Sequence, residues 1–265
     1  MERPRWAPAD IDLTRPSPAR VYDYFLGGTH NFAVDREIAE RAIAASPEIP
    51  YGARSNRAFL GRAVRHMAEQ GVTQFLDLGS GIPTQDPTHE VAARSHPDAR
   101  VVYVDSDPVA VAHSRALLAD DGRGAVLQAD IRDPKAILDS DAVTSTIDFS
   151  RPVGLLLLAL LHFLSEDDDP GGVVATLADA VVPGSYLAIS HVCAPPGADV
   201  GRLEREMRKP PQLAYLRNRD QIARFFDGWD VVEPGLVPPA LWRPEGVPGQ
   251  QAYQVPALAG VGRRR

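Results

Sequence analysis

The chain has 265 residues, which suits one large domain or one domain with an extension. Its formal net charge of −7 argues against a general nucleic-acid binder, because phosphate affinity is built from clustered lysine and arginine. Cys193 is the only cysteine, so no internal disulfide and no cysteine zinc site can form. We expect a reducing, cytoplasmic compartment and no metal site.

The most apolar run, VGLLLLALLHFL at residues 153–164, is too short to span a bilayer and is closely followed by an acidic run at 166–169. The N-terminal residues also lack the apolar core of a signal peptide. We therefore expect no membrane partner and interpret the apolar run as a buried strand.

The first part of the chain predicts helices. Residues 1–16 are rich in proline and arginine without periodicity, which favours a loose arm. Ser17 and Pro18 can open a helix that runs to the Gly27-Gly28 pair. Further helices are expected at 34–46 and from Ser55 to Gly71, so that residues 17–71 form a helical N-terminal cap.

From residue 72 onward, apolar strands alternate with helices. Such alternation predicts a mostly parallel sheet that is covered by helices on both faces. The last two strands have only a proline-rich loop between them, so we expect them to pair antiparallel at one edge. The strands are expected at 73–79, 100–105, 124–130, 152–160, 184–192, 229–237 and 253–262, with later helices near 199–208 and 218–227.

The first three strands each end in an aspartate, namely Asp77, Asp105 and Asp130. Ligands of doubly wound sheets bind beyond the carboxyl ends of the strands. There, Asp105 is placed to accept the two hydroxyls of a ribose, and Asp130 with the apolar Ile131 suits an adenine. The alternative for each aspartate taken separately is a helix cap.

The loop after the first strand, Gly79-Ser80-Gly81, brings backbone N–H groups near a ligand. A nicotinamide fingerprint would require a third glycine to hold a pyrophosphate, but Pro83 and Thr84 follow instead. A site without a phosphate cradle favours S-adenosylmethionine over NAD.

The series FLDLGSG, VVYVDSDP, QADIRDP, LLLLALLHFL and LAISH is similar to class I S-adenosylmethionine-dependent methyltransferases. More narrowly, RPSPARVYDYFLGGTHNFAVDRE, DLGSGIPT, RDQIARFFDGWDVVEPGLV and WRPE resemble a largely actinobacterial family of such proteins, long labelled as of unknown function. The resemblance covers residues 11 to 263. It implies an α/β, Rossmann-like, doubly wound sheet of seven strands over residues 72–263, in the order 3-2-1-4-5-7-6 with strand 7 antiparallel.

The resemblance also implies the cofactor, S-adenosyl-L-methionine, and how it is held. Asp77, Gly79 and Gly81 would surround the methionine moiety, Asp105 the ribose, and Asp130 with Ile131 the adenine. Ser80 and Ser106, in the same loops, complete this part of the predicted set.

The stretch RVYDYFLGGTHNF at residues 20–32 allows two interpretations. In the first, the N-terminal helices close the cofactor pocket, with Gly28 approaching the cofactor and Tyr22 or Asn31 donating to its carboxylate. In the second, the glycine pair is a Schellman-type helix end with aromatic side chains packed on the core.

Methyl transfer from a sulfonium requires alignment and exclusion of water more than it requires a base. If a base is used, His162 and His191 are the candidates near the ends of the fourth and fifth strands; the alternative for each is a packed structural histidine. The sequence thus favours a methyltransferase acting on a small molecule by in-line transfer. A regulatory protein that binds the cofactor without turnover stays an alternative, and a homo-oligomer is compatible with either.

Overall fold

The computed structural model describes residues 11–83, 86–119, 121–195, 198 and 214–265. Within these residues one sheet runs in the order β3-β2-β1-β4-β5-β7-β6. β7 is antiparallel to β5 and β6, and the other neighbouring strands are parallel, which confirms the predicted topology. The strands are β1 Gln74–Leu78, β2 Arg100–Asp105, β3 Gly124–Gln128, β4 Gly154–Leu158, β5 Tyr186–Val192, β6 Trp229–Val231 and β7 Ala257–Arg264.

The described α-helices flank this sheet, and none of them combines the length and apolarity needed to cross a membrane. They are α1 Pro18–Phe25, α2 Ala33–Ala45, α3 Ile49–Glu69, α4 Thr88–Ala93, α5 Pro108–Leu117, α6 Pro134–Leu138, α7 Asp141–Thr144, α8 Pro170–Asp179 and α10 Arg219–Arg224. Short 3-10 turns are η1 Leu161–Phe163, η2 Glu166–Asp168, η3 Pro239–Leu241 and η4 Gln250–Tyr253.

Some predicted boundaries are wrong, including the start of the last strand, which is Ala257 rather than residue 253, and the end of the third, which is Gln128 rather than residue 130. Two others differ for local reasons. α3 begins at Ile49 rather than Ser55, because Pro50 occupies the first turn, where its fixed φ suits a helix and no N–H is needed. The strand expected at 229–237 ends at Val231, since Pro234 and Gly235 turn the chain. The helix expected near 199–208 lies outside the described residues.

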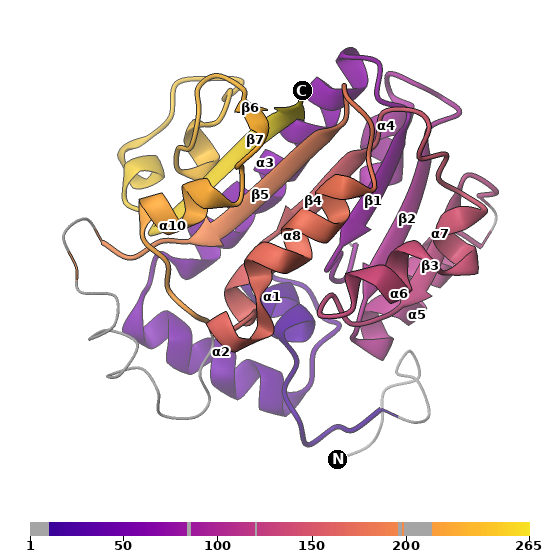
Figure 1. The fold of residues 1–265 in the computed structure, drawn as a ribbon. Helices are drawn as coiled ribbons and strands as arrows, with labels where there is room; N and C mark the ends of the chain where they lie inside the picture. The colour runs from indigo at the N-terminus through magenta and orange to yellow at the C-terminus, as the bar shows by residue number, and fades with distance from the viewer. Residues whose placement is uncertain (1–10, 84–85, 120, 196–197, 199–213) are drawn as a thin grey trace.

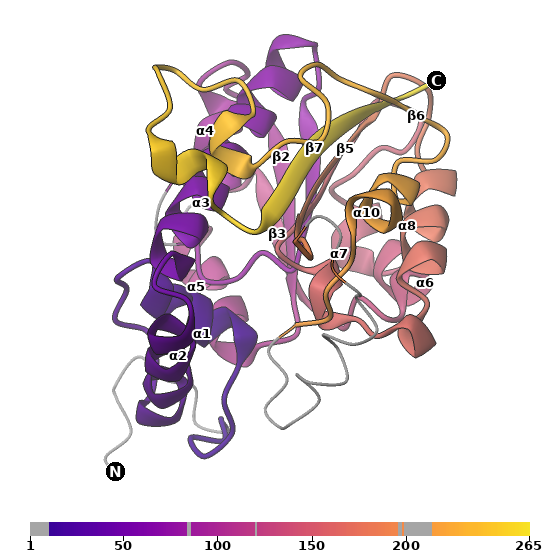
Figure 2. The ribbon, with the colours of Figure 1, turned by 90° about the vertical axis from the view of Figure 1, so that its left-hand side faces the viewer.

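Alternating strand residues feed two buried clusters, one on each face of the sheet. Leu76, Val102 and Leu155 pack under α6, α7, α8 and α10, whereas Phe75, Val101 and Leu156 pack under α3 and α4. Figures 1 and 2 show the resulting three layers, with α3 and α8 on opposite faces of the sheet.

The helices α1 and α2 lie at the carboxyl ends of the parallel strands (Figure 1). They meet the sheet domain through a smaller apolar cluster, here called the cap cluster, of Ile11, Phe32, Ile82, Val109 and Ala110. Of the arm predicted at 1–16, residues 1–10 lie outside the described residues. Ile11 is buried, so this end of the arm is part of the cap interface rather than loose.

The glycine pair after α1 forms a helix end of the Schellman type. The N–H of Gly28 donates to the carbonyl of Asp23 at 2.8 Å, and that of Gly27 to Tyr24 at 2.9 Å. Gly27 has φ +81°, the left-handed conformation that glycine adopts at little cost. At Gly28 a Cβ would lie 2.1 Å from Oδ1 of Asp23, so only glycine admits this buried carboxylate.

Substitution of Gly28 tests this packing. We expect Gly28→Ala to lower the free energy of unfolding by about 1–3 kcal/mol, because the added methyl must displace the Asp23 side chain. Gly61→Ala in α3 is the control: nothing lies within 4 Å of its Cβ, and alanine should raise helix stability by about 0.5–1 kcal/mol. Urea unfolding measures both. Equal stability of Gly28→Ala and wild type would show that Asp23 moves aside without cost.

Candidate functional site

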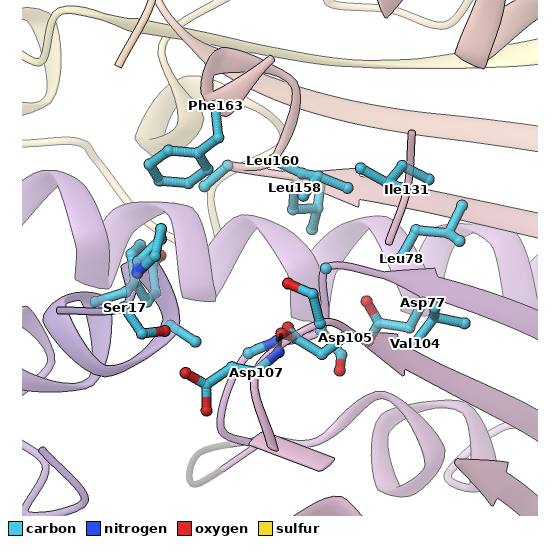
Figure 3. Close-up of a pocket in the computed structure, with 18 of the residues that line it drawn as sticks. Ser17, Asp77, Leu78, Val104, Asp105, Asp107, Ile131, Leu158, Leu160 and Phe163 are labelled. Carbon is cyan, nitrogen blue, oxygen red and sulfur yellow. Dashed lines mark hydrogen bonds between the residues drawn. The ribbon is translucent and has the colours of Figure 1, made fainter. Parts of the chain in front are cut away.

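A cavity of about 290 Å³ opens at the carboxyl ends of β1, β2 and β4 and is bordered by α1 and α3. Figure 3 shows the carboxylates of Asp77, Asp105 and Asp107 close together on one side, and Leu158, Leu160 and Phe163 along the other. Most of the residues predicted to bind the cofactor line this cavity. They are Tyr22, Asp77, Gly79, Ser80, Gly81, Asp105, Ser106, Asp130 and Ile131.

Asp105, at the end of β2, is buried and held by two backbone donors. The N–H of Gly81 donates to its Oδ2 and the N–H of Asp107 to its Oδ1, both at 2.8 Å. Burial outweighs these bonds and raises the pKa of Asp105 to about 6. Each carboxylate oxygen keeps a lone pair, so the group can still accept hydrogen bonds from a diol.

Asp77, at the end of β1, is equally buried. Its Oδ2 accepts a hydrogen bond from Oγ1 of Thr88 at 2.6 Å, and burial raises its pKa to about 6. The loop that follows turns at Gly79 and Gly81, with φ of +66° and +62°. A Cβ at Gly79 would lie 2.5 Å from Leu160, so this glycine is required both for the turn and for the contact between the two loops.

The chain leaving β4 reverses at Ala159, which has φ +52°, a strained value for a residue with a Cβ. Its N–H is held by the carbonyl of Ser190 at 3.1 Å and by the hydroxyl of Ser190 at 2.8 Å. This turn places Leu160 against Gly79 and starts an apolar cavity wall. We call Leu160, Phe163 and Leu164 the apolar wall.

Asp130 and Ile131 differ in environment. Asp130 is half-exposed and receives hydrogen bonds from Arg132, which hold its pKa below the usual range. Ile131 is buried beside it and belongs to the main core cluster. The pair thus offers one polar and one apolar contact at the same edge of the cavity.

Gly28 and Asn31 do not line the cavity. The amide of Asn31 donates to Oδ2 of Asp23 at 2.8 Å and to the carbonyl of Gly28 at 3.0 Å. Both residues therefore serve the end of α1. Tyr22 reaches the cavity, but its hydroxyl donates to the carbonyl of Ala53 and accepts from Asn56, both at 2.9 Å. The geometry thus favours the helix-end interpretation for Gly28 and Asn31, while α1 itself borders the cavity.

His162 and His191 also lie outside the cavity lining, buried and ring against ring with centroids 5.4 Å apart. His191 donates from Nδ1 to the carbonyl of Val192 at 2.6 Å, because its Nε2 must accept from Arg217 at 2.9 Å. Burial lowers the pKa of His191 to about 4 and that of His162 well below its usual value. The geometry favours the alternative of packed structural histidines.

The sequence reasoning missed three arginines. Arg57 on α3 lines the cavity; Arg20 on α1 pairs with Asp107 at its edge; and Arg217 is buried behind the apolar wall, where it donates to the carbonyls of Leu161 and Leu164. Their partners are distant in sequence, so no local motif predicts these contacts. For Arg57 a signal existed: one helical turn separates it from the buried Leu60, which also lines the cavity.

Two polar atoms at the cavity indicate a polar ligand. Oγ of Ser80 and Oδ1 of Asn56 are buried and have no hydrogen-bond partner among the described residues. Buried polar atoms are normally satisfied, so these two fit a ligand that supplies the missing donors or acceptors. Together with the Asp105 carboxylate, they suit the hydroxyls and amino-acid group of an adenosyl amino acid.

Comparison with known proteins agrees with this geometry. The model of the S-adenosyl methyltransferase family matches residues 4–265. A protein of Thermobifida fusca YX, described as a candidate methyltransferase, is 43% identical; the match covers 99% of this chain and 100% of that one, with a TM-score of 0.91. A DUF574 family protein of Streptomyces avermitilis MA-4680 is 38% identical over 94% of this chain and 98% of its own, with a TM-score of 0.87.

A more distant structure shares the fold: the 1,6-didemethyltoxoflavin N1-methyltransferase of Burkholderia thailandensis, solved with S-adenosylhomocysteine, is 16% identical. That match covers 79% of this chain and 78% of that one, with a TM-score of 0.50. No curated protein matches the chain. The family match and the two similar structures confirm the resemblance seen in the sequence: the chain belongs to the S-adenosyl methyltransferase family, and S-adenosylmethionine is its cofactor.

Proposed function

We propose that the cavity holds S-adenosylmethionine and that the protein transfers its methyl group to a small molecule. The observation that carries this proposal is that one cavity joins the carboxylates at the carboxyl ends of β1 and β2, and that of Asp130 just beyond β3, to the apolar wall. A net charge of −7 disfavours a nucleic-acid acceptor, and an apolar wall suits a small organic one.

The adenosine end of the cofactor would be held by Asp105 at the ribose and by Asp130 with Ile131 at the adenine. Asp105 is supported in this role by its two backbone donors, which fix both oxygens and leave lone pairs for the diol. Ser80, Gly81 and Ser106 would border the same moiety.

The methionine end is a zwitterion, and the cavity lining carries side chains of both signs. Asp77 suits the ammonium and Arg57 the carboxylate. The two side chains are near enough for the Arg57 charge to lower the pKa of Asp77 against the larger effect of burial. Asn56, with its unsatisfied Oδ1, lies beside Arg57 on α3.

When bound, S-adenosylmethionine supplies a methyl group that the sulfonium already activates. The role of the protein would then be to align the acceptor and to exclude water, and the apolar wall is suited to both. The described lining contains no histidine, cysteine or lysine, and each of its aspartates is already hydrogen-bonded.

Some predictions from the sequence stay predictions: the cytoplasmic compartment, a homo-oligomer, the division into residues 1–16, 17–71 and 72–263, and the regulatory alternative without turnover.

A turnover measurement distinguishes the proposed methyltransferase from a regulatory protein that only binds the cofactor. Incubated with methyl-labelled S-adenosylmethionine and a small-metabolite extract, the protein should form S-adenosylhomocysteine and one labelled product, both detected by mass spectrometry. The cofactor at a hundred times its Kd should also stabilise the fold by about 2.7 kcal/mol, whereas NAD should not. Stabilisation by the cofactor without any demethylated product in every extract would favour the regulator.

Arg57→Gln tests the assignment of the carboxylate. It should weaken S-adenosylhomocysteine binding by about 10- to 100-fold, the worth of a hydrogen bond to a charged group. Binding of 5′-methylthioadenosine, which has the same nucleoside and thioether but no amino acid, should not change. Asp105→Asn is the matched control and should weaken both ligands. Calorimetry measures all four combinations; equal losses of both ligands in Arg57→Gln would contradict the assignment.

The pH dependence tests Asp105, with adenosine as a probe that has no amino-acid group of its own. In the folded, ligand-free protein the pKa of Asp105 is about 6, whereas the usual value, expected in the unfolded chain, is near 3.9. Between these pH values the folded protein therefore keeps a proton on Asp105 that the unfolded chain has lost. The stability that this group contributes therefore falls as pH rises from about 4 to about 6. Adenosine affinity should instead rise with pH: if the Asp105 anion accepts the hydrogen bonds, affinity should fall about tenfold for each pH unit below 6. Asp105→Asn should bind weakly with no such dependence, and a flat wild-type profile would contradict the role.

A further inference from the structure

Arg20 is a buried cation between the cap and the sheet domain. Its Nε donates to Oδ2 of Asp35 on α2 at 2.9 Å, and its Nη1 donates to Oδ2 of Asp107 at 3.2 Å. The side chains of Arg20, Asp35 and Asp107 are only 4%, 0% and 7% exposed. Removing one partner from an ion pair this buried strongly destabilises the fold, because the remaining charge is then neither paired nor hydrated.

Asp107 connects this cation to the cofactor site. Its Oδ1 caps α5 by accepting from the N–H of Val109 at 2.7 Å, while its Oδ2 accepts from Arg20. Its own N–H donates to Oδ1 of Asp105 at 2.8 Å. Arg20 is thus two interactions away from the carboxylate proposed to bind the ribose.

The contact needs the shape of a guanidinium. A third donor, Nη2, bonds to the carbonyl of Arg15 at 2.5 Å, and the planar group lies 4.9 Å from the ring centroid of Phe32. A lysine ammonium is a single point of charge, so it cannot span the carboxylates of Asp35 and Asp107 in this way.

This contact adds a polar link to the apolar interface between the cap and the sheet domain. The cap cluster is separate from the two clusters that cover the sheet. α1 nevertheless supplies Ser17, Pro18, Ala19 and Tyr22 to the cavity. Whatever fixes α1 therefore also completes the wall of the site.

We propose that Arg20 is a positioning residue for the cofactor: through Asp107 it orients the Asp105 carboxylate, and through α1 it completes the cavity. Docking of the cap and binding of the adenosine moiety are then one coupled event. This inference rests on the proposed function, because it takes the cavity as the cofactor site.

The test compares Arg20→Lys with wild type by calorimetry, using S-adenosylhomocysteine and adenosine as probes. Both affinities should fall by about tenfold or more, as happens when a partner that orients a binding group is lost in metal sites. The two losses should be similar, since the effect reaches the ligand through the ribose carboxylate. Asp107→Asn is the second variant, for use if Arg20→Lys does not fold. It keeps the side-chain oxygen that caps α5 and the backbone N–H but loses the charge, and it should weaken both ligands to a similar extent.

The control is Arg36→Met in the same cap, which removes hydrogen bonds to Asn31 but touches neither Asp107 nor the cavity. It should lower the melting temperature and leave both affinities unchanged. A lower melting temperature of Arg20→Lys with unchanged affinities would show a merely structural role and overturn the proposal. A loss confined to S-adenosylhomocysteine would also overturn it, since adenosine carries the ribose. If wild type binds neither probe, the proposed cofactor site itself fails.

Discussion

A buried carboxylate must be given hydrogen-bond donors by the chain, and Asp105 imposes this constraint on the whole cofactor side of the cavity. One donor, the N–H of Gly81, requires the loop after β1 to turn in the left-handed region. The other, the N–H of Asp107, requires the chain to leave β2 sharply and enter α5 at Pro108. The two loops proposed to border the nucleoside are therefore built around one side chain.

Two buried arginines hold the walls on either side of this centre. Arg20 joins the cap to the loop after β2, and Arg217 holds the loop after β4. Each does so from a distant part of the chain, by donating to several partners at once, as the planar guanidinium allows. The walls of the cavity are thus held by long-range polar contacts, in addition to the apolar packing against the sheet.

The strands and the aspartates near their ends could be predicted from local patterns: apolar runs of strand length, glycine after the first strand, and an acid after each of the first three. The order of the strands does not follow from such patterns and is implied by the resemblance to known methyltransferases. The glycine pair at residues 27 and 28 could not be assigned, since a helix end and a ligand-contacting turn have the same local sequence. Contacts in the fold distinguish them: a Cβ at Gly28 would lie 2.1 Å from Asp23, and Gly28 does not line the cavity.

The histidines show the same limit. A histidine at a strand end can act as a base or pack as a neutral ring, and the choice at His191 is decided by Arg217, whose position in the fold no local motif reveals. Arg57 was missed for a related reason: a cation on an amphipathic helix is usually exposed, and its spacing from Leu60 becomes informative only once α3 is placed against the cavity.

Arg217 binds carbonyl oxygens of the loop after β4, together with His191 and Glu166, and none of the side chains of the apolar wall. The path of this loop is therefore set by backbone contacts, while Leu160, Phe163 and Leu164 project into the cavity from it. Of the three, Leu160 is constrained by its contact with Gly79, whereas Phe163 is 37% exposed. The wall at Phe163 can accordingly change its shape without disturbing the loop, whereas the carboxylate side cannot change without losing its donors. If the apolar wall faces the acceptor, as proposed, such a division would let one scaffold keep its cofactor while the acceptor side adapts.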